Sequence, residues 1–152
     1  MDTKPKLENL ARDVNDLLLE YIDIHNSLME KSNTPLSVFR PIDFESFEKK
    51  TENLLVKMVE KTSEVRDFNE HPDLISPNQK EFHTNLYNYC EALVETLKSL
   101  LEMISGLLEK SMGSRGRKYS VAEYRKAFAK YKESRENYFK YGAELNRLYD
   151  KI

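Results

Sequence analysis

The chain has no tryptophan, one cysteine, four glycines and five prolines among its 152 residues. The single cysteine, Cys90, excludes an internal disulfide framework and fits a reducing compartment, so we expect the cytoplasm. This composition is not that of a sheet protein or of a disordered one. Lys+Arg number 24 and Asp+Glu 26, and the net charge of −2 provides no global field for nucleic acid or a membrane.

Long uninterrupted apolar runs are also missing. The most apolar segment, residues 93–108, contains Glu95, Lys98 and Glu102, so we expect no transmembrane helix. The first residues are charged throughout, and we expect no signal peptide. With 33% charged and 39% hydrophobic residues, the composition is typical of a helical protein.

Apolar residues recur at spacings of three and four in four segments, which predicts helices at about residues 7–31, 44–69, 77–112 and 121–150. Asp43, Ser76 and Ser120 precede three of these segments and are predicted N-caps, the serines within the capping boxes SPNQ and SVAE. The connections are short. The fold predicted for residues 1–152 is therefore a single all-α domain, an antiparallel up-down-up-down four-helix bundle with a longer second hairpin.

The last helix follows a heptad pattern like that of a coiled coil. Its predicted core-facing residues are Val121, Tyr124, Phe128, Tyr131, Arg135, Tyr138, Gly142, Leu145 and Tyr149. A buried arginine needs a polar partner unless it reaches the surface along its stem. Glycine inside a helix costs about 1 kcal/mol relative to alanine and suits a cavity or a close backbone approach. Arg135, Tyr131, Tyr138 and Gly142 are therefore a candidate buried polar or ligand site, with ordinary core packing as the alternative.

A second candidate site follows from the topology, because the first and third connections lie at the same end of the bundle. This candidate interaction pole consists of Leu36, Val38, Phe39, Arg40, Arg115, Arg117 and Lys118. Apolar anchors rimmed by arginine are typical of protein-binding surfaces. In the competing interpretation, the apolar residues cover the end of the core and leave only a solvated basic turn.

Residues 110–135 are rich in cations, with aromatic residues between them. Because the aromatic residues fall on core-facing positions, they are not free to stack on bases, and we interpret the cations as a solvated face. The glycine pattern GSRG matches neither a dinucleotide-binding nor a P-loop motif. Nucleic-acid binding is therefore the weaker alternative.

The residue types that carry catalysis are not arranged for it. None of the three histidines (His25, His71 and His83) has a glutamate three residues before it, as the metal-binding bundles require, so we expect no metal or cofactor. Cys90 lies on the predicted buried stripe without a nearby histidine in sequence, so it does not resemble a nucleophile. We expect a protein that is not an enzyme and has no catalytic residues.

These observations favour a protein-interaction or structural role, with a protein partner or self-association as a homo-oligomer. One alternative is a small-molecule-binding bundle that uses the tyrosine-rich last helix and Arg135. Another is binding of an anionic partner, a nucleic acid or a surface, through Arg115–Lys118. Affinity that falls steeply with salt would favour the anionic partner, and ligand-induced thermal stabilisation would favour the small molecule.

Overall fold

The computed structural model describes residues 3–33, 42–68, 76–111 and 120–152. They form four helices, α1 (Lys4–Asn33), α2 (Phe44–Arg66), α3 (Pro77–Ser111) and α4 (Val121–Tyr149), and the described residues contain no strand. Every predicted helix end lies within three residues of the observed one. The all-α class is confirmed.

Side-chain caps explain where three of the helices begin. The Asp43 carboxylate accepts a hydrogen bond from Ser46 N at 3.0 Å, and Ser76 Oγ accepts one from Gln79 N at 3.2 Å. Ser120 Oγ accepts a third bond, from the backbone N–H three residues later, at 3.1 Å. The three predicted N-caps are confirmed, because each satisfies a backbone donor that has no partner within its helix.

Two helix ends differ from their predicted positions by three residues. Helix α1 begins at Lys4 rather than at about residue 7, and Leu7 N donates to Thr3 O at 3.1 Å. Pro5 is compatible with this first turn, because the amide hydrogen that proline lacks would have no intrahelical acceptor there. Helix α2 ends at Arg66 rather than at about residue 69, where the N–H of Asp67 bonds back to Ser63 O at 3.0 Å.

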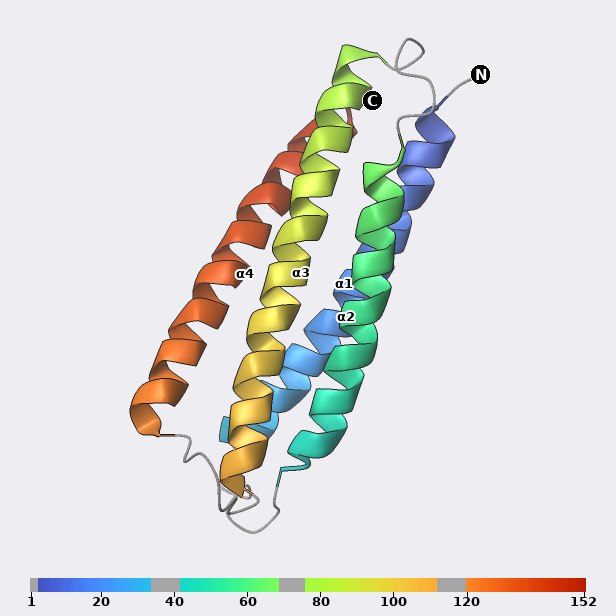
Figure 1. Cartoon of the computed structure of the whole chain (residues 1–152). Helices are drawn as coiled ribbons and strands as arrows, with labels where there is room; N and C mark the ends of the chain where they lie inside the picture. Colours follow the sequence, from blue (N-terminus) through green and yellow to red (C-terminus); the bar gives the residue numbers. More distant parts are fainter. Residues whose placement is uncertain (1–2, 34–41, 69–75, 112–119) are drawn as a thin grey trace.

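The helices alternate in direction along the chain, as an up-down-up-down bundle requires (Figure 1). The second hairpin is the longer one, because α3 has 35 residues and α4 has 29, against 30 in α1 and 23 in α2. Helix α3 is central, with Cα atoms within 8 Å of each of the other three helices. Among the described residues, no Cα atom of α1 lies within 8 Å of one of α4. The bundle is therefore open along the side where α1 and α4 would meet.

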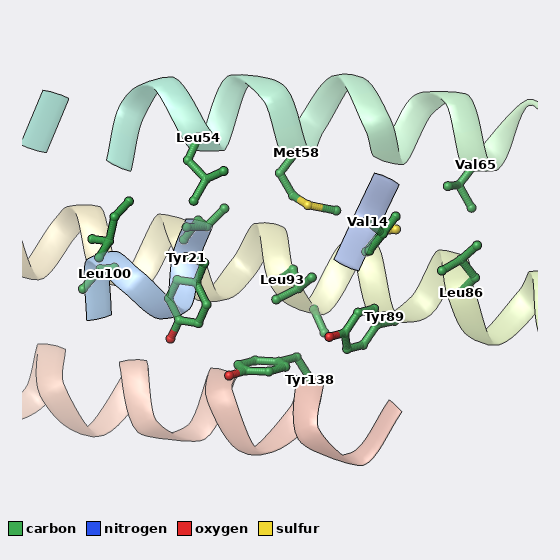
Figure 2. Close-up of a cluster of buried hydrophobic side chains, with 14 of the residues drawn as sticks. Val14, Tyr21, Leu54, Met58, Val65, Leu86, Tyr89, Leu93, Leu100 and Tyr138 are labelled. Carbon is green, nitrogen blue, oxygen red and sulfur yellow. The ribbon is translucent and has the colours of Figure 1, made fainter. Parts of the chain in front are cut away.

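The core consists of apolar stripes that the helical spacing predicts. Val14, Leu54, Met58 and Leu93 are among its buried members, and Figure 2 shows them between α1, α2 and α3. Buried threonines satisfy their hydroxyl groups within their own helices; Thr51, for example, donates to Phe47 O at 2.7 Å. The core is thus mostly apolar, with few polar atoms to satisfy.

The heptad pattern predicted for α4 is right in the middle of the helix and wrong at its ends. Tyr131 and Tyr138 are buried, but Val121 is 57% exposed and Tyr149 is 49% exposed. Leu148 is buried in place of Tyr149, at 1% exposure. A straight helix has 3.6 residues per turn, so its buried face drifts away from a strict seven-residue repeat.

Candidate binding groove

The predicted interaction pole lies outside the residues that the structure describes. Its members are Leu36, Val38, Phe39, Arg40, Arg115, Arg117 and Lys118. Both interpretations of these loops stay predictions. The other predicted site, around Arg135, lies within the described residues and borders the open side of the bundle.

A groove of about 580 Å³ lies between α1 and α4. On α1 the lining extends from Glu8 to Ile22, and on α4 it extends from Tyr138 to Tyr149. At 1.5 Å per residue, the lined part of α1 is about 20 Å long. The floor belongs to α3, through Phe82, Leu86 and Tyr89. The groove thus occupies the space that a fully closed bundle would fill with direct packing between α1 and α4.

The lining combines half-buried apolar side chains with side chains that are mostly polar and exposed. Polar side chains come from Glu8, Arg12, Asn15 and Asn146, and the apolar contributors include Ala11, Leu18, Ile22, Phe139 and Leu145. Phe139 is 52% exposed, a large fraction for a phenylalanine. Binding surfaces commonly combine apolar side chains with polar ones in this way.

Gly142 shapes the floor of the groove. A Cβ atom added at Gly142 would lie 3.2 Å from Cε2 of Tyr89, closer than ordinary van der Waals contact. The absence of a side chain therefore allows the Tyr89 ring to lie directly against the backbone of α4. Tyr89 also contacts Tyr138 edge-on, with ring centroids 6.1 Å apart.

A hydrogen-bonded network connects α1 to α4 beyond one end of the groove. The hydroxyl oxygens of Tyr21 and Tyr131 are 2.5 Å apart, and Tyr131 Oη lies 2.6 Å from Nδ1 of His25. The Tyr21 and Tyr138 rings meet edge-on at 5.8 Å, and Figure 2 shows Tyr21 pointing from α1 toward α4. A neutral imidazole has one donor and one acceptor nitrogen, so both hydrogen bonds can form with His25 uncharged.

Arg135 lies beside this network on α4. Its guanidinium carbon is 5.3 Å from the ring centre of Phe139 and 5.9 Å from that of Tyr131. Its Nε atom is buried without a hydrogen-bond partner, and Arg135 makes no ion pair with any described residue. Two aromatic faces therefore hold a cation whose charge no described carboxylate neutralises.

Burial controls the protonation of the network. Burial first, and the positive charge of Arg135 second, together lower the pKa of His25 to about 4. Burial also raises the pKa values of Tyr21 and Tyr131 far above their ordinary range. Near neutral pH the tyrosines and His25 are therefore uncharged, and Arg135 supplies the only positive charge of this cluster.

Of the four residues of the predicted polar site, Tyr138 and Gly142 line the groove, whereas Arg135 and Tyr131 contact each other beside it. That these four form a ligand site stays a prediction. The structure adds four residues that sequence reasoning left out: Tyr21, His25, Tyr89 and Phe139. The sequence contains a pattern that indicates two of them, because Tyr21 and His25 lie one helical turn apart on the predicted buried face of the first helix. Nothing in the sequence indicates which helix that face would contact.

The described residues contain no group of three or more His, Cys, Asp or Glu side chains placed to hold a metal ion. His83 donates from Nε2 to Val65 O at 2.5 Å, which is a structural role. Cys90 is fully buried, and burial raises the pKa of its thiol to about 12.

No helix in the described part of the chain combines the length and the apolar character needed to cross a bilayer. Comparisons with protein-family models, with curated proteins and with solved structures find no match for this chain.

Proposed function

We propose that this protein is a non-catalytic interaction module that recognises a protein partner through the groove between α1 and α4. The observation that carries the proposal is the groove itself, which has a volume of about 580 Å³ and lies along the open side of the bundle. The single buried thiol, Cys90, is compatible with the cytoplasm, where we place this activity.

Exposed apolar side chains at the groove support a protein partner. Phe139 and Tyr149 line it and are 52% and 49% exposed. Large aromatic side chains at the centre of a surface are the residues that most often dominate binding energy between proteins. Arg12 and Asn146, which also line the groove, add hydrogen-bonding groups.

The shape of the groove favours an α-helix as the bound element. Its two walls are the lined parts of two antiparallel helices, each about 20 Å long, so one further helix can lie along them with its apolar face inward. Three to four turns of such a helix would present side chains at spacings of three and four residues to the floor. A helix bound here would complete the packing that α1 and α4 do not make with each other.

Capture experiments with matched variants test the proposal. Phe139→Glu places a charge in the groove, whereas Val56→Glu places one on α2 at a valine that is 58% exposed and does not line the groove. Immobilised wild type, Phe139→Glu and Val56→Glu are compared for the proteins that they retain from cell extract, identified by mass spectrometry. We expect a groove partner to be retained by wild type and Val56→Glu and lost from Phe139→Glu.

Cross-linking then locates the contact. Partner cross-links should map to the α1 segment from Glu8 to Ile22 and to the C-terminal half of α4. If every retained protein binds Phe139→Glu as well as wild type, and cross-links map elsewhere, the groove is not the recognition surface.

One observation favours a second function, the binding of an amphipathic carboxylate such as a medium-chain fatty acid. Arg135, stacked on Phe139 beside the groove, lacks a carboxylate partner among the described residues, and the volume of the groove lies within the usual range for ligand sites. Laurate should then raise the melting temperature of wild type and have less effect on Arg135→Met. Equal melting temperatures with and without laurate would remove this candidate.

A further inference from the structure

We infer that the helix bound in the groove carries an acidic side chain, Asp or Glu, that pairs with Arg135 at one end of the groove. This inference rests on the proposed function, because it uses the same groove and names the chemistry of the bound helix. Three features of Arg135 support it: its height along the bundle, the side of α4 on which it lies, and its lack of a carboxylate partner among the described residues.

Arg135 lies close to the height of the last lining residue of α1. The hydrogen bond between His25 and Tyr131 places these two residues near one height. Ile22 lies three residues before His25 on α1, and Arg135 lies four residues after Tyr131 on α4. Because the two helices run in opposite directions (Figure 1), both steps go the same way, by about 4.5 Å and about 6 Å. Ile22 lines the groove, so Arg135 marks this end of it.

Arg135 also lies on the side of α4 that faces the groove. Phe139 and Gly142 line the groove four and seven residues further along α4, so they are one and two helical turns from Arg135 on the same face. The guanidinium carbon is 5.3 Å from the ring centre of Phe139. Burial raises the pKa of Tyr138, another lining residue, and the nearby positive charge of Arg135 opposes this effect. A chain that lies along the groove past Phe139 therefore meets Arg135 next.

No described residue neutralises the charge of Arg135. Glu136 is the nearest carboxylate in sequence, but adjacent residues point about 100° apart around a helix, and among the described residues it forms no ion pair with Arg135. Burial raises the pKa values of Tyr21 and Tyr131, so their hydroxyl groups are uncharged near neutral pH. The Nε atom of Arg135 is buried without a hydrogen-bond partner. The guanidinium therefore keeps its full charge.

A helix that fills the groove would cover this charge. Arg135 is half-buried, and a bound helix that reaches the height of Ile22 would remove water from the part still exposed. An apolar cover would not replace the hydrogen bonds to that water, which is costly for a charged group. A carboxylate presents two oxygen atoms in the geometry that a guanidinium binds best. Complementary charge therefore favours a bound helix that is acidic at this end.

The opposite end of the groove favours neither sign of charge. Glu8 and Arg12 line it there with opposite charges, and the Glu8 carboxylate already lies 3.9 Å from Nζ of Lys4. The acidic residue thus belongs to the end of the bound helix that reaches Arg135. Because Arg135 and Phe139 are one turn apart, the acidic residue should lie three or four positions from the apolar residue that packs on Phe139.

Peptide display on the full chain tests the inference. A phage library of random peptides of about 16 residues, about 24 Å long as helices, is selected on wild type, Arg135→Met and Phe139→Glu. Arg135→Met keeps an unbranched side chain and removes the charge. Lys140→Met, which removes an exposed cation of α4 outside the lining, is the matched control. Circular dichroism verifies that each variant is folded, and Arg135→Gln replaces Arg135→Met if the methionine variant unfolds.

The selected sequences should differ at one position. We expect wild type and Lys140→Met to select amphipathic sequences with Asp or Glu at a fixed place, three or four residues from an apolar residue. Arg135→Met should select the same apolar pattern without the acidic residue. Fluorescence anisotropy then compares one selected peptide with its twin that has glutamine or asparagine in place of the acid. The twin should bind wild type about tenfold more weakly, and the two peptides should bind Arg135→Met equally.

Two results of the selection would overturn the inference, and they have different consequences for the proposed function. If the acidic position is missing from the wild-type peptides, or if Arg135→Met retains the preference for it, the pairing with Arg135 is excluded. Peptides that still fail to bind Phe139→Glu would then leave the proposed function standing. If no selected peptide depends on Phe139, a helical occupant is excluded and the proposed function fails as well.

Two other occupants would also be detected. A rise in the melting temperature with laurate, in a protein that selects no groove peptide, would assign the groove to a small carboxylate. A wild-type dimer in sedimentation equilibrium that Phe139→Glu dissociates would assign it to a second copy of the chain. Either result would overturn the inference.

Discussion

The hydroxyl groups of Tyr21 and Tyr131 lie 2.5 Å apart, and this contact joins two helices whose backbones do not approach each other. Tyr131 also bonds to His25, so one hydroxyl group holds two side chains of α1. We therefore expect Tyr131→Phe to lower the free energy of unfolding by about 1–3 kcal/mol, because it leaves buried polar atoms without a partner.

Urea denaturation of Tyr131→Phe measures this loss, and Tyr149→Phe, at a tyrosine that is 49% exposed, is the matched control. The control should remain within about 0.5 kcal/mol of wild type. If both substitutions give the same change, the network does not stabilise the fold.

The stability of the fold should depend on His25 in mild acid. In the folded protein its pKa is lowered to about 4 from an ordinary value of 6.5, so between these values the unfolded chain binds more protons. The contribution of His25 to the free energy of unfolding is therefore complete above about pH 6.5 and is lost as the pH falls toward 4. Arg135 and the hydroxyl of Tyr131 face His25 from α4, and Tyr21 adjoins it on α1.

Urea denaturation from pH 7 to pH 4 gives the comparison. Over this range the free energy of unfolding of His25→Gln should fall less than that of wild type, because glutamine takes up no proton. The carboxylates contribute equally to both proteins. Titration of the His25 ring protons by NMR should give a pKa near 4, and an ordinary value near 6.5 would contradict the prediction.

Gly142 should resist replacement by alanine because of Tyr89. Alanine favours the helix by about 1 kcal/mol, but the new Cβ would lie 3.2 Å from a buried ring, so we expect the two effects to cancel approximately. In a Tyr89→Leu background the Tyr89 ring is gone, so Gly142→Ala should raise the free energy of unfolding by the full helix preference of about 1 kcal/mol. Ala143→Gly, at the exposed neighbouring position, measures the helix preference alone. Equal effects of Gly142→Ala in both backgrounds would show that the Tyr89 ring imposes no constraint.

The start of α4 should depend on one side chain. Ser120→Ala removes the acceptor for the N–H of Glu123 and should cost about 1 kcal/mol of unfolding free energy. Ser120→Asp keeps an acceptor at this position and should retain most of the stability in the same denaturation experiment. An aspartate variant as unstable as the alanine variant would contradict the capping role.

The Cys90 thiol should react only after unfolding. It is 0% exposed, and burial raises its pKa to about 12, so the folded protein holds almost no accessible thiolate at neutral pH. Reaction with a thiol-specific dye should therefore be slow in buffer and fast in concentrated urea. Rapid labelling of the folded protein would show that the core around α3 opens readily.

Periodicity and caps were sufficient to predict the helices, because each depends on neighbours within one turn. Ser76 and Ser120 can be identified from four-residue patterns, and Tyr131 and Tyr138 from the spacing of apolar residues. Leu148 could not be identified in the same way, because its burial depends on how far α4 departs from a strict heptad.

The groove itself could not be predicted. It depends on the distance between α1 and α4, which is set by how both helices pack on α3 and not by any local pattern. Tyr131 and Arg135 could be selected as unusual core residues, but their partners Tyr21 and His25 lie more than 100 positions away in sequence.

The central position of α3 also determines which part of the bundle should open first. Within the described residues, the backbone of α4 has only α3 as a close neighbour, whereas α2 is flanked by both α1 and α3. Amide hydrogens of α4 should therefore exchange with solvent through a partial opening in which this helix detaches while the other three stay packed. The hydrogen bonds from Tyr131 to Tyr21 and His25 oppose that detachment, so Tyr131→Phe should accelerate exchange in α4 before it affects α3.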